Sequence, residues 1–278
     1  MAKLSAFADE VTDDFRGQII FLTSENVRLI EIRFVNKKNI LDLTAKELHD
    51  ARLLMADHGI RVSAIASPIG KVRLDEPFGP HLDRFKHAVD LALYFESPFI
   101  RIFSYYPPPG ERIEAHRVEI LDRMARKVEL LDRTNVVMVH ENESDIYGST
   151  AERCVDMVKS IGSPKFRLAY DPANFVWAHK MKNNVEICWP LMKPYVAHVH
   201  LKDWKIGIDS AGSMIGEGDA QIPELLTDLA KMKYDGFVTV EPHLKWAGQF
   251  GGDTGPELFS QAIAATRILC RDAGLRCE

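Results

Sequence analysis

Cysteine is scarce in this sequence and follows no recognised pattern. The four cysteines, at positions 154, 188, 270 and 277, show no C-x-x-C spacing, which argues against a structural zinc site. The first ten residues, MAKLSAFADE, have neither the charged nor the apolar region of a secretory signal. We therefore expect a cytoplasmic protein with reduced thiols.

Long apolar runs and an excess of positive charge are also missing. The longest runs, SPFIRIF and VVMVH, have the length of a strand, whereas a membrane span needs about 20 apolar residues. The net charge of -5 offers no general attraction to a nucleic-acid backbone. The sequence therefore predicts a soluble protein that binds neither membranes nor nucleic acid.

Short runs rich in β-branched and aromatic residues recur along the chain, as is typical of buried strands. They are KLSAF (3–7), RLIEIRF (28–34), RVSAIAS (61–67), FIRIFS (99–104), VVMVHE (136–141), FRLAYD (166–171), AHVHLK (197–202) and FVTVE (237–241). Amphipathic stretches lie between them, such as 45–59, where Thr44 and Gly59 are the expected N-cap and C-cap, and 115–133. This alternation predicts a parallel sheet with right-handed crossovers.

Eight repeats favour a closed barrel over an open sheet, because closure removes both edge strands. Links from helix to strand are short, whereas links from strand to helix are long, notably 105–114, 204–223 and 242–256. In a barrel such long loops lie at the C-terminal ends of the strands, where active sites are built. We predict an α/β fold, a single-domain (β/α)8 TIM barrel over residues 1–278.

Strands five to eight each end on a side chain that can bind a metal ion. These residues are Glu141, Asp171, His200 and Glu241. Taken singly, a strand-final acid usually caps a helix or meets water. Neighbouring parallel strands lie about 4.8 Å apart, however, and their ends converge at the barrel mouth, so four such residues in consecutive strands predict a common site.

Three carboxylates at such short separations repel one another in a partly dry pocket, so either some are protonated or a cation lies among them. A single divalent ion is the simpler solution. Oxygen ligands with one nitrogen favour Mn²⁺, with Mg²⁺ and Co²⁺ as alternatives. The sequence therefore predicts one divalent ion as the cofactor.

Other polar residues are candidates for substrate contacts at the mouth. His198 and Lys202 share the inward parity of His200; His198 could bind substrate, support the metal ligand or fill a core layer. Arg101, at the end of strand four, and Glu31 and Arg33, at the end of strand two, could contact substrate, or could form arginine–glutamate pairs in the barrel rim.

Two glycine-rich segments carry weaker signals. GEGD (216–219) could offer amides to a phosphate, but the sequence lacks the Walker lysine and the dinucleotide fingerprint, so we expect a turn before a helix over 222–232. FGGDTGPE (250–257) is interpreted as a mobile loop before a helix whose first turn contains Pro256.

Several motifs together resemble the xylose isomerase-like barrel superfamily, the sugar phosphate isomerase/epimerase group. They are SAFADE (5–10), AIASPIGKV (64–72), HENESDIYGSTAERC (140–154), YDPANF (170–175), HVHLKD (198–203), GEGDAQIPELL (216–226) and YDGFVTVEPH (234–243). The group includes ketose 3-epimerases, hydroxypyruvate isomerases and inosose-processing enzymes. The resemblance covers essentially the whole chain.

This resemblance implies that Glu141, Asp171, His200 and Glu241 bind one divalent metal, often manganese in such enzymes. Ketose epimerases also have a substrate-binding histidine three residues after the aspartate, and a loop glutamate. Asn174 and Tyr147 occupy those positions here. The departures therefore concern substrate contacts and not the metal ligands.

A metal bound to a hydroxyl and a neighbouring carbonyl would stabilise the enediolate that forms when the α-proton leaves. Glu141 and Glu241 would then act as base and acid. The sequence thus predicts an isomerase or epimerase acting on a keto sugar or sugar phosphate.

Other function classes remain open at this point. A lyase or dehydratase acting on a keto-polyol or 3-oxo-sugar is the main alternative. An endonuclease-type phosphodiesterase would need more clustered histidines and a basic groove, and a non-catalytic sugar-binding protein is the remaining class. The expected partner is a small carbohydrate, and assembly into a homo-oligomer is possible.

Overall fold

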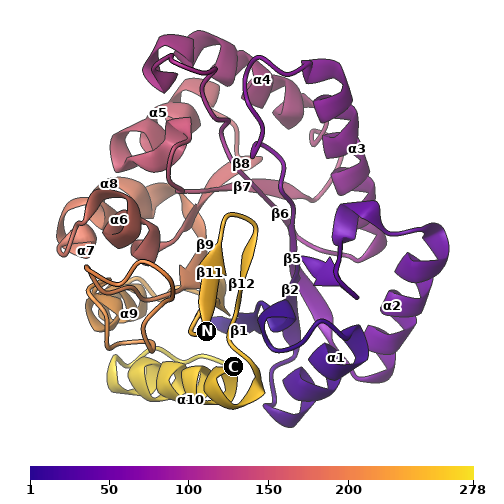
Figure 1. The fold of residues 1–278 in the computed structure, drawn as a ribbon, viewed down its shortest axis with the longest axis vertical. Helices are drawn as coiled ribbons and strands as arrows, with labels where there is room; N and C mark the ends of the chain where they lie inside the picture. Colours follow the sequence, from indigo (N-terminus) through magenta and orange to yellow (C-terminus); the bar gives the residue numbers. More distant parts are fainter.

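Eight parallel strands close into a barrel in the computed structural model, which describes residues 1–278 (Figure 1). The barrel strands are β1 (Lys3–Ala6), β2 (Leu29–Ile32), β5 (Arg61–Ala66), β6 (Phe99–Ile102), β7 (Val137–Glu141), β8 (Phe166–Tyr170), β9 (Val196–Leu201) and β10 (Phe237–Val240). They pair in this order around the barrel, and β10 pairs with β1. The eight strands expected from the sequence are all present, and the predicted TIM barrel is confirmed.

Helices surround the barrel on its outer side (Figure 1). They are α1 (Phe15–Ser24), α2 (Ala45–Asp57), α3 (Phe78–Tyr94), α4 (Arg117–Glu129), α5 (Ala151–Ile161), α6 (Pro172–His179), α7 (Asn184–Ile187), α8 (Trp189–Met192), α9 (Ile222–Lys231) and α10 (Pro256–Asp272). Three short helices, α6 to α8, replace a single long one between β8 and β9. No helix combines the length and the apolar character that crossing a bilayer requires.

One continuous core joins the barrel to the helices. A single cluster of 69 buried apolar residues includes strand residues such as Ile30 and Val238 and helix residues such as Leu22 and Phe259. Since separate domains would each have their own core, the chain forms a single domain, as predicted.

Helix α2 begins after the predicted N-cap, Thr44, and its C-cap is His58, one residue before the predicted Gly59. The Thr44 hydroxyl accepts from the amide of Glu47, whose carboxylate accepts from the Thr44 amide at 2.8 Å, forming a capping box. The helix ends at Asp57, and Gly59 follows with a φ of +66°, a left-handed conformation that suits glycine.

Two hairpins outside the barrel were not expected from the sequence: β3 (Phe34–Val35) with β4 (Lys38–Asn39), and β11 (Trp246–Gly248) with β12 (Gly251–Asp253). The second lies across the open centre of the barrel in Figure 1. It corrects the interpretation of 250–257 as a loop, because residues 251–253 pair with residues 246–248. Its two-residue connection lacks the Asn-Gly or Asp-Gly signal by which such hairpins are usually recognised.

The GEGD turn folds around a carboxylate at the end of β9. Asp203 Oδ2 accepts from the amides of Gly216 and Gly218, both at 2.9 Å, and Oδ1 accepts from those of Trp204 and Ala220. These amides are therefore used within the chain, and the turn leads into α9 as predicted.

Asp203→Ala is expected to lower the free energy of unfolding by about 3 kcal/mol, because several amides would lose their charged acceptor. Asp219→Ala is the matched control in the same loop, since its partly exposed carboxylate accepts one backbone amide, from Ile206; its expected cost is below about 1 kcal/mol. Urea unfolding monitored by circular dichroism measures both. Equal losses would contradict the role assigned to Asp203.

Candidate functional site

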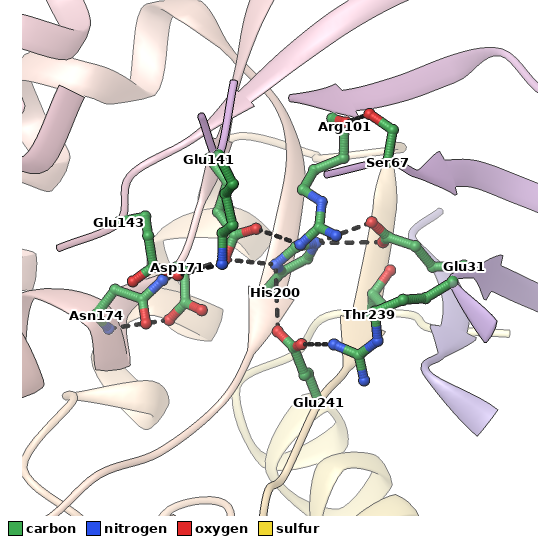
Figure 2. Close-up of polar contacts among 12 residues, drawn as sticks. Glu31, Ser67, Arg101, Glu141, Glu143, Asp171, Asn174, His200, Thr239 and Glu241 are labelled. Atoms are coloured by element: carbon green, nitrogen blue, oxygen red, sulfur yellow. Dashed lines mark hydrogen bonds and ion pairs between the residues drawn. The ribbon is translucent and has the colours of Figure 1, made fainter. Parts of the chain in front are cut away.

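Four side chains from the last four barrel strands meet at one end of the barrel. Glu141 ends β7, Asp171 follows β8, His200 lies on β9 and Glu241 follows β10. All four are buried, and one ligand atom from each lies within 4.8 Å of the others. Figure 2 shows the three carboxylates gathered around His200. The structure thus brings together the four residues that the sequence placed at consecutive strand ends.

Two buried atoms of this cluster, His200 Nδ1 and Glu241 Oε2, have no hydrogen-bond partner. Buried polar atoms are rarely left in this state unless something else satisfies them. His200 Nδ1 lies 3.4 Å from Glu141 Oε1 and 3.6 Å from Glu241 Oε2. Carboxylate oxygens with one imidazole nitrogen suit Mn²⁺ or Mg²⁺, so these residues fit a divalent ion.

The imidazole of His200 is oriented by a carboxylate on β2. His200 Nε2 lies 3.2 Å from Glu31 Oε2, which also contacts His198 Nε2 at 2.6 Å. Although burial disfavours the carboxylate, the two histidines lower the pKa of Glu31 well below its usual range. This contact fixes the ring so that Nδ1 faces the cluster, as carboxylates commonly do for metal-binding histidines.

His198 lies one layer deeper in the barrel than His200. It is fully buried, and its Nε2 contacts Glu31 and, at 3.2 Å, the Thr239 hydroxyl. It does not line the cavity described below. The sequence left several roles open for His198. Its position fits one of them, which is to support the neighbouring His200 through Glu31.

Glu141 is held by basic and amide groups. Arg101 Nη1 donates to its Oε2 at 2.8 Å, and Asn174 Nδ2 donates to its Oε1 at 3.1 Å. Burial raises the pKa of Glu141, but His200 and Arg101 together hold it well below its usual range. The side chain is therefore a carboxylate at neutral pH, with its orientation fixed.

Glu241 has a similar environment on the other side of the cluster. Arg33 Nη1 donates to Glu241 Oε1 at 2.6 Å, and Arg33 Nε donates to Asp9 at 2.7 Å. Burial raises the pKa of Glu241, but Lys202, His243 and Arg33 lower it to about 2. The rim arginines that the sequence singled out thus pair with the two glutamates.

Lys202 lies between two acids of the cluster. Its Nζ is 2.7 Å from Asp171 Oδ2 and 3.7 Å from Glu241 Oε2. Burial raises the pKa of Asp171 to about 6, although Lys202 opposes the change. Burial disfavours the charged lysine, but Asp171 and Glu241 outweigh that effect and raise the pKa of Lys202. A permanent cation therefore lies beside the cluster.

A cavity of about 620 Å³ opens beside these residues. Among the residues singled out from the sequence, Arg33, Arg101, Glu141, Asn174, Lys202 and Glu241 line it.

Tyr147, expected from the sequence as a substrate contact, does not line this cavity. Its hydroxyl donates to Asp156 on α5 at 2.7 Å. The side chain therefore faces the helix layer, and the structure gives no support to a substrate contact there.

Sequence reasoning missed a buried network that flanks Glu241. Glu10 Oε2 accepts from the His243 amide at 2.8 Å and from the Thr254 hydroxyl at 2.7 Å, and Glu10 Oε1 lies 2.9 Å from His243 Nδ1. Two signals pointed to it: the acid pair that follows the first strand, and the histidine two residues after Glu241.

Residues 23–269 match the family model described as xylose isomerase-like TIM barrel. The chain belongs to this family. This match confirms the resemblance to xylose isomerase-like barrels that the sequence motifs indicated. A comparison with curated proteins finds no match.

Solved xylose isomerase-like barrels align with nearly the whole chain. One from Mycobacterium smegmatis, in complex with magnesium, aligns with a TM-score of 0.76 at 14% identity over 98% of this chain and 96% of that one. D-psicose 3-epimerase with D-tagatose, from Clostridium cellulolyticum H10, gives 0.75 and 14% over 99% and 100% of the two chains. A probable 3-DHS dehydratase from Bacillus anthracis gives 0.75 and 15% over 96% and 99%. At such identities the alignments show the shared fold.

In this xylose isomerase-like barrel, Arg33→Ala is expected to lower the free energy of unfolding by about 3 kcal/mol or more, because buried Asp9 and Glu241 would lose their cation. Arg84→Ala is the control, since its ion pair with Asp42 is exposed and worth at most about 1 kcal/mol. Urea unfolding of the two variants measures the difference. A loss for Arg33→Ala no larger than the control would refute the buried pairing.

Proposed function

We propose that the protein is a divalent-metal-dependent isomerase or epimerase that acts on a keto sugar through an enediolate. The observation that carries this proposal is the convergence of Glu141, Asp171, His200 and Glu241 beside a cavity of about 620 Å³. Mn²⁺ is the proposed ion, with Mg²⁺ and Co²⁺ as alternatives. The shared fold with a sugar 3-epimerase supports the same assignment.

A divalent cation held by these four residues would polarise a substrate carbonyl and stabilise the negative charge of the enediolate. Glu141 and Glu241 both line the cavity and are both ionised, so each can accept a proton from a substrate carbon. In this proposal Asp171 and His200 serve mainly as ligands.

The basic side chains at the site have separate tasks in this proposal. Arg101 and Arg33 each donate to one of the two glutamates and so fix the direction in which the carboxylate faces. Lys202 lines the cavity as a cation and can donate a hydrogen bond to a substrate oxygen. Asn174 positions Glu141 through its amide.

A lyase or dehydratase is the second candidate, because Lys202 offers a charged proton donor at the cavity wall, 3.7 Å from Glu241. After a glutamate removes the α-proton, such a donor could protonate a β-hydroxyl as it leaves. The shared fold with a probable dehydratase is compatible with this alternative.

The proposed metal site predicts that the protein binds one Mn²⁺ per chain in isothermal titration calorimetry. Loss of a residue that supports a metal ligand typically weakens metal binding roughly 10–100-fold. Asp171→Asn and His200→Ala are expected to weaken Mn²⁺ binding by more than this. Glu31→Gln is expected to weaken it by an amount within this range. Glu143→Gln is the control, because Glu143 lines the cavity outside the cluster. Unchanged Mn²⁺ affinity in Asp171→Asn would remove the proposed site.

Proton transfer by the glutamates predicts that the metal-loaded protein incorporates solvent deuterium into keto sugars in deuterated water. Retention of every substrate oxygen supports an isomerase or epimerase, whereas loss of water supports a lyase. Glu141→Gln and Glu241→Gln are each expected to slow the exchange roughly 100-fold or more, and Glu152→Gln, on the exposed face of α5, serves as control.

Both glutamates are also proposed metal ligands, so the Mn²⁺ content of each variant is measured in the same samples. Slow exchange by a variant that keeps its metal identifies loss of proton transfer. Full exchange in either glutamine variant would contradict the assignment.

A further inference from the structure

The cavity beside the metal-ligand cluster is larger than one hexose requires. Its volume is about 620 Å³. A hexose has about a dozen non-hydrogen atoms and, even at the roughly 30 Å³ that each water molecule occupies in the liquid, fills at most about 360 Å³. A keto sugar whose reacting carbon lies at Glu141 and Glu241 therefore leaves room for a second group of comparable size.

Each lysine and arginine that lines this cavity is already paired with a carboxylate. The pairs are Arg33–Glu241 at 2.6 Å, Lys71–Glu143 at 3.0 Å, Arg84–Asp42 at 2.8 Å, Arg101–Glu141 at 2.8 Å and Lys202–Asp171 at 2.7 Å. Phosphate binding depends on donors that can form charge-assisted hydrogen bonds to the phosphate oxygens. Such donors would have to exchange a carboxylate partner here.

Two of these ion pairs, Lys71–Glu143 and Arg84–Asp42, lie outside the metal-ligand cluster. They indicate whether the second group can carry a negative charge. A phosphate remote from the reacting carbon would lie near Lys71 or Arg84, whose carboxylate partners line the same wall. Asp145 adds further negative charge to the lining, whereas Asp209 is paired with Lys180 at 3.8 Å. This wall disfavours an anion and favours an uncharged group.

The outer wall of the cavity combines aromatic faces with planar polar groups. Trp177 and Phe250 both line it and are 37% and 50% exposed. Asn39 and Asp209 lie in the same lining and offer amide and carboxylate groups for hydrogen bonds. Aromatic surface with a few hydrogen-bonding groups suits a ring that is apolar on its faces and polar at its edges, as a sugar ring is.

The β11–β12 hairpin covers part of this outer wall. Its connecting residues, Gln249 and Phe250, line the cavity. Gln249 Nε2 donates to the Tyr106 hydroxyl at 3.0 Å, and the carbonyl of Gln249 accepts from Lys71. Figure 1 shows the hairpin crossing the centre of the barrel. The space for a second group is thus partly enclosed rather than open to solvent.

We infer that the substrate is an uncharged keto sugar that carries a second sugar ring, and that Trp177 and Phe250 bind this second ring. The inference rests on the proposed function, because that function places the reacting carbon at the two glutamates. The inferred substrate is thus glycosylated and carries no phosphate.

The test compares five sugars with the Mn²⁺-loaded protein: D-fructose, D-fructose 6-phosphate and the keto-disaccharides maltulose, lactulose and isomaltulose, each of which contains fructose. Calorimetry measures binding, and nuclear magnetic resonance in deuterated water measures proton exchange. At least one keto-disaccharide is expected to bind at least tenfold more tightly than fructose, and the phosphate no more tightly than fructose. Equal or tighter binding of fructose or its phosphate, or no binding by any keto-disaccharide, overturns the inference.

Two tryptophan variants locate the second ring. Trp177→Ala is expected to weaken binding of the preferred keto-disaccharide about tenfold more than it weakens binding of fructose. Trp246→Ala is the matched control, because Trp246 is 55% exposed on the hairpin but does not line the cavity. Equal losses for both sugars in Trp177→Ala would overturn the assigned position.

Binding and exchange are measured separately so that two kinds of failure can be told apart. Exchange on fructose without a preference for disaccharides leaves the proposed function intact and refutes the larger substrate. Tighter disaccharide binding without exchange on any sugar supports the larger substrate and refutes the proposed chemistry.

Discussion

The pairing of buried carboxylates with buried cations is the constraint on which the site depends. Glu141, Asp171 and Glu241 are each at most 2% exposed and lie close together. An uncompensated buried charge costs several kcal/mol, so each acid requires a basic partner from another strand or its loop. These partners are Arg101, Lys202 and Arg33, in the order of the acids. Because acid and cation come from different strands, closure of the barrel is what brings the pairs together.

The sequence predicted the barrel and the position of the site because both depend on local order. Alternating strands and helices set the topology, and strand ends converge in any parallel barrel. Asp171 illustrates how one residue can have both a structural role and a proposed functional role. Its Oδ1 accepts from the Asn174 amide as the N-cap of α6, while Oδ2 faces Lys202 and the cluster. Pro172 at the first position of α6 forces the strand to end there.

The partners at the rim could not be predicted, because they join segments that are distant in sequence. Arg33 follows β2 but contacts Asp9 near the start of the chain and Glu241 near its end. No periodicity within a strand specifies which rim residues meet once the barrel closes. The β11–β12 hairpin was missed for a different reason: its turn is formed by Gln249 and Phe250 rather than by residues that favour such turns.

The hairpin and Glu241 are positioned by the same short segment, the 3₁₀ turn at Ala8–Glu10. Glu10 accepts from the amide of His243, before the hairpin, and from the hydroxyl of Thr254, after it. The adjacent Asp9 holds Arg33, which in turn holds Glu241. The two ends of the hairpin and Glu241, a proposed proton-transfer residue, are therefore held by the same buried segment. A displacement of the base of the hairpin would disturb the carboxylate of Glu241. The position of the outer wall of the cavity and the position of the site beneath it are therefore coupled.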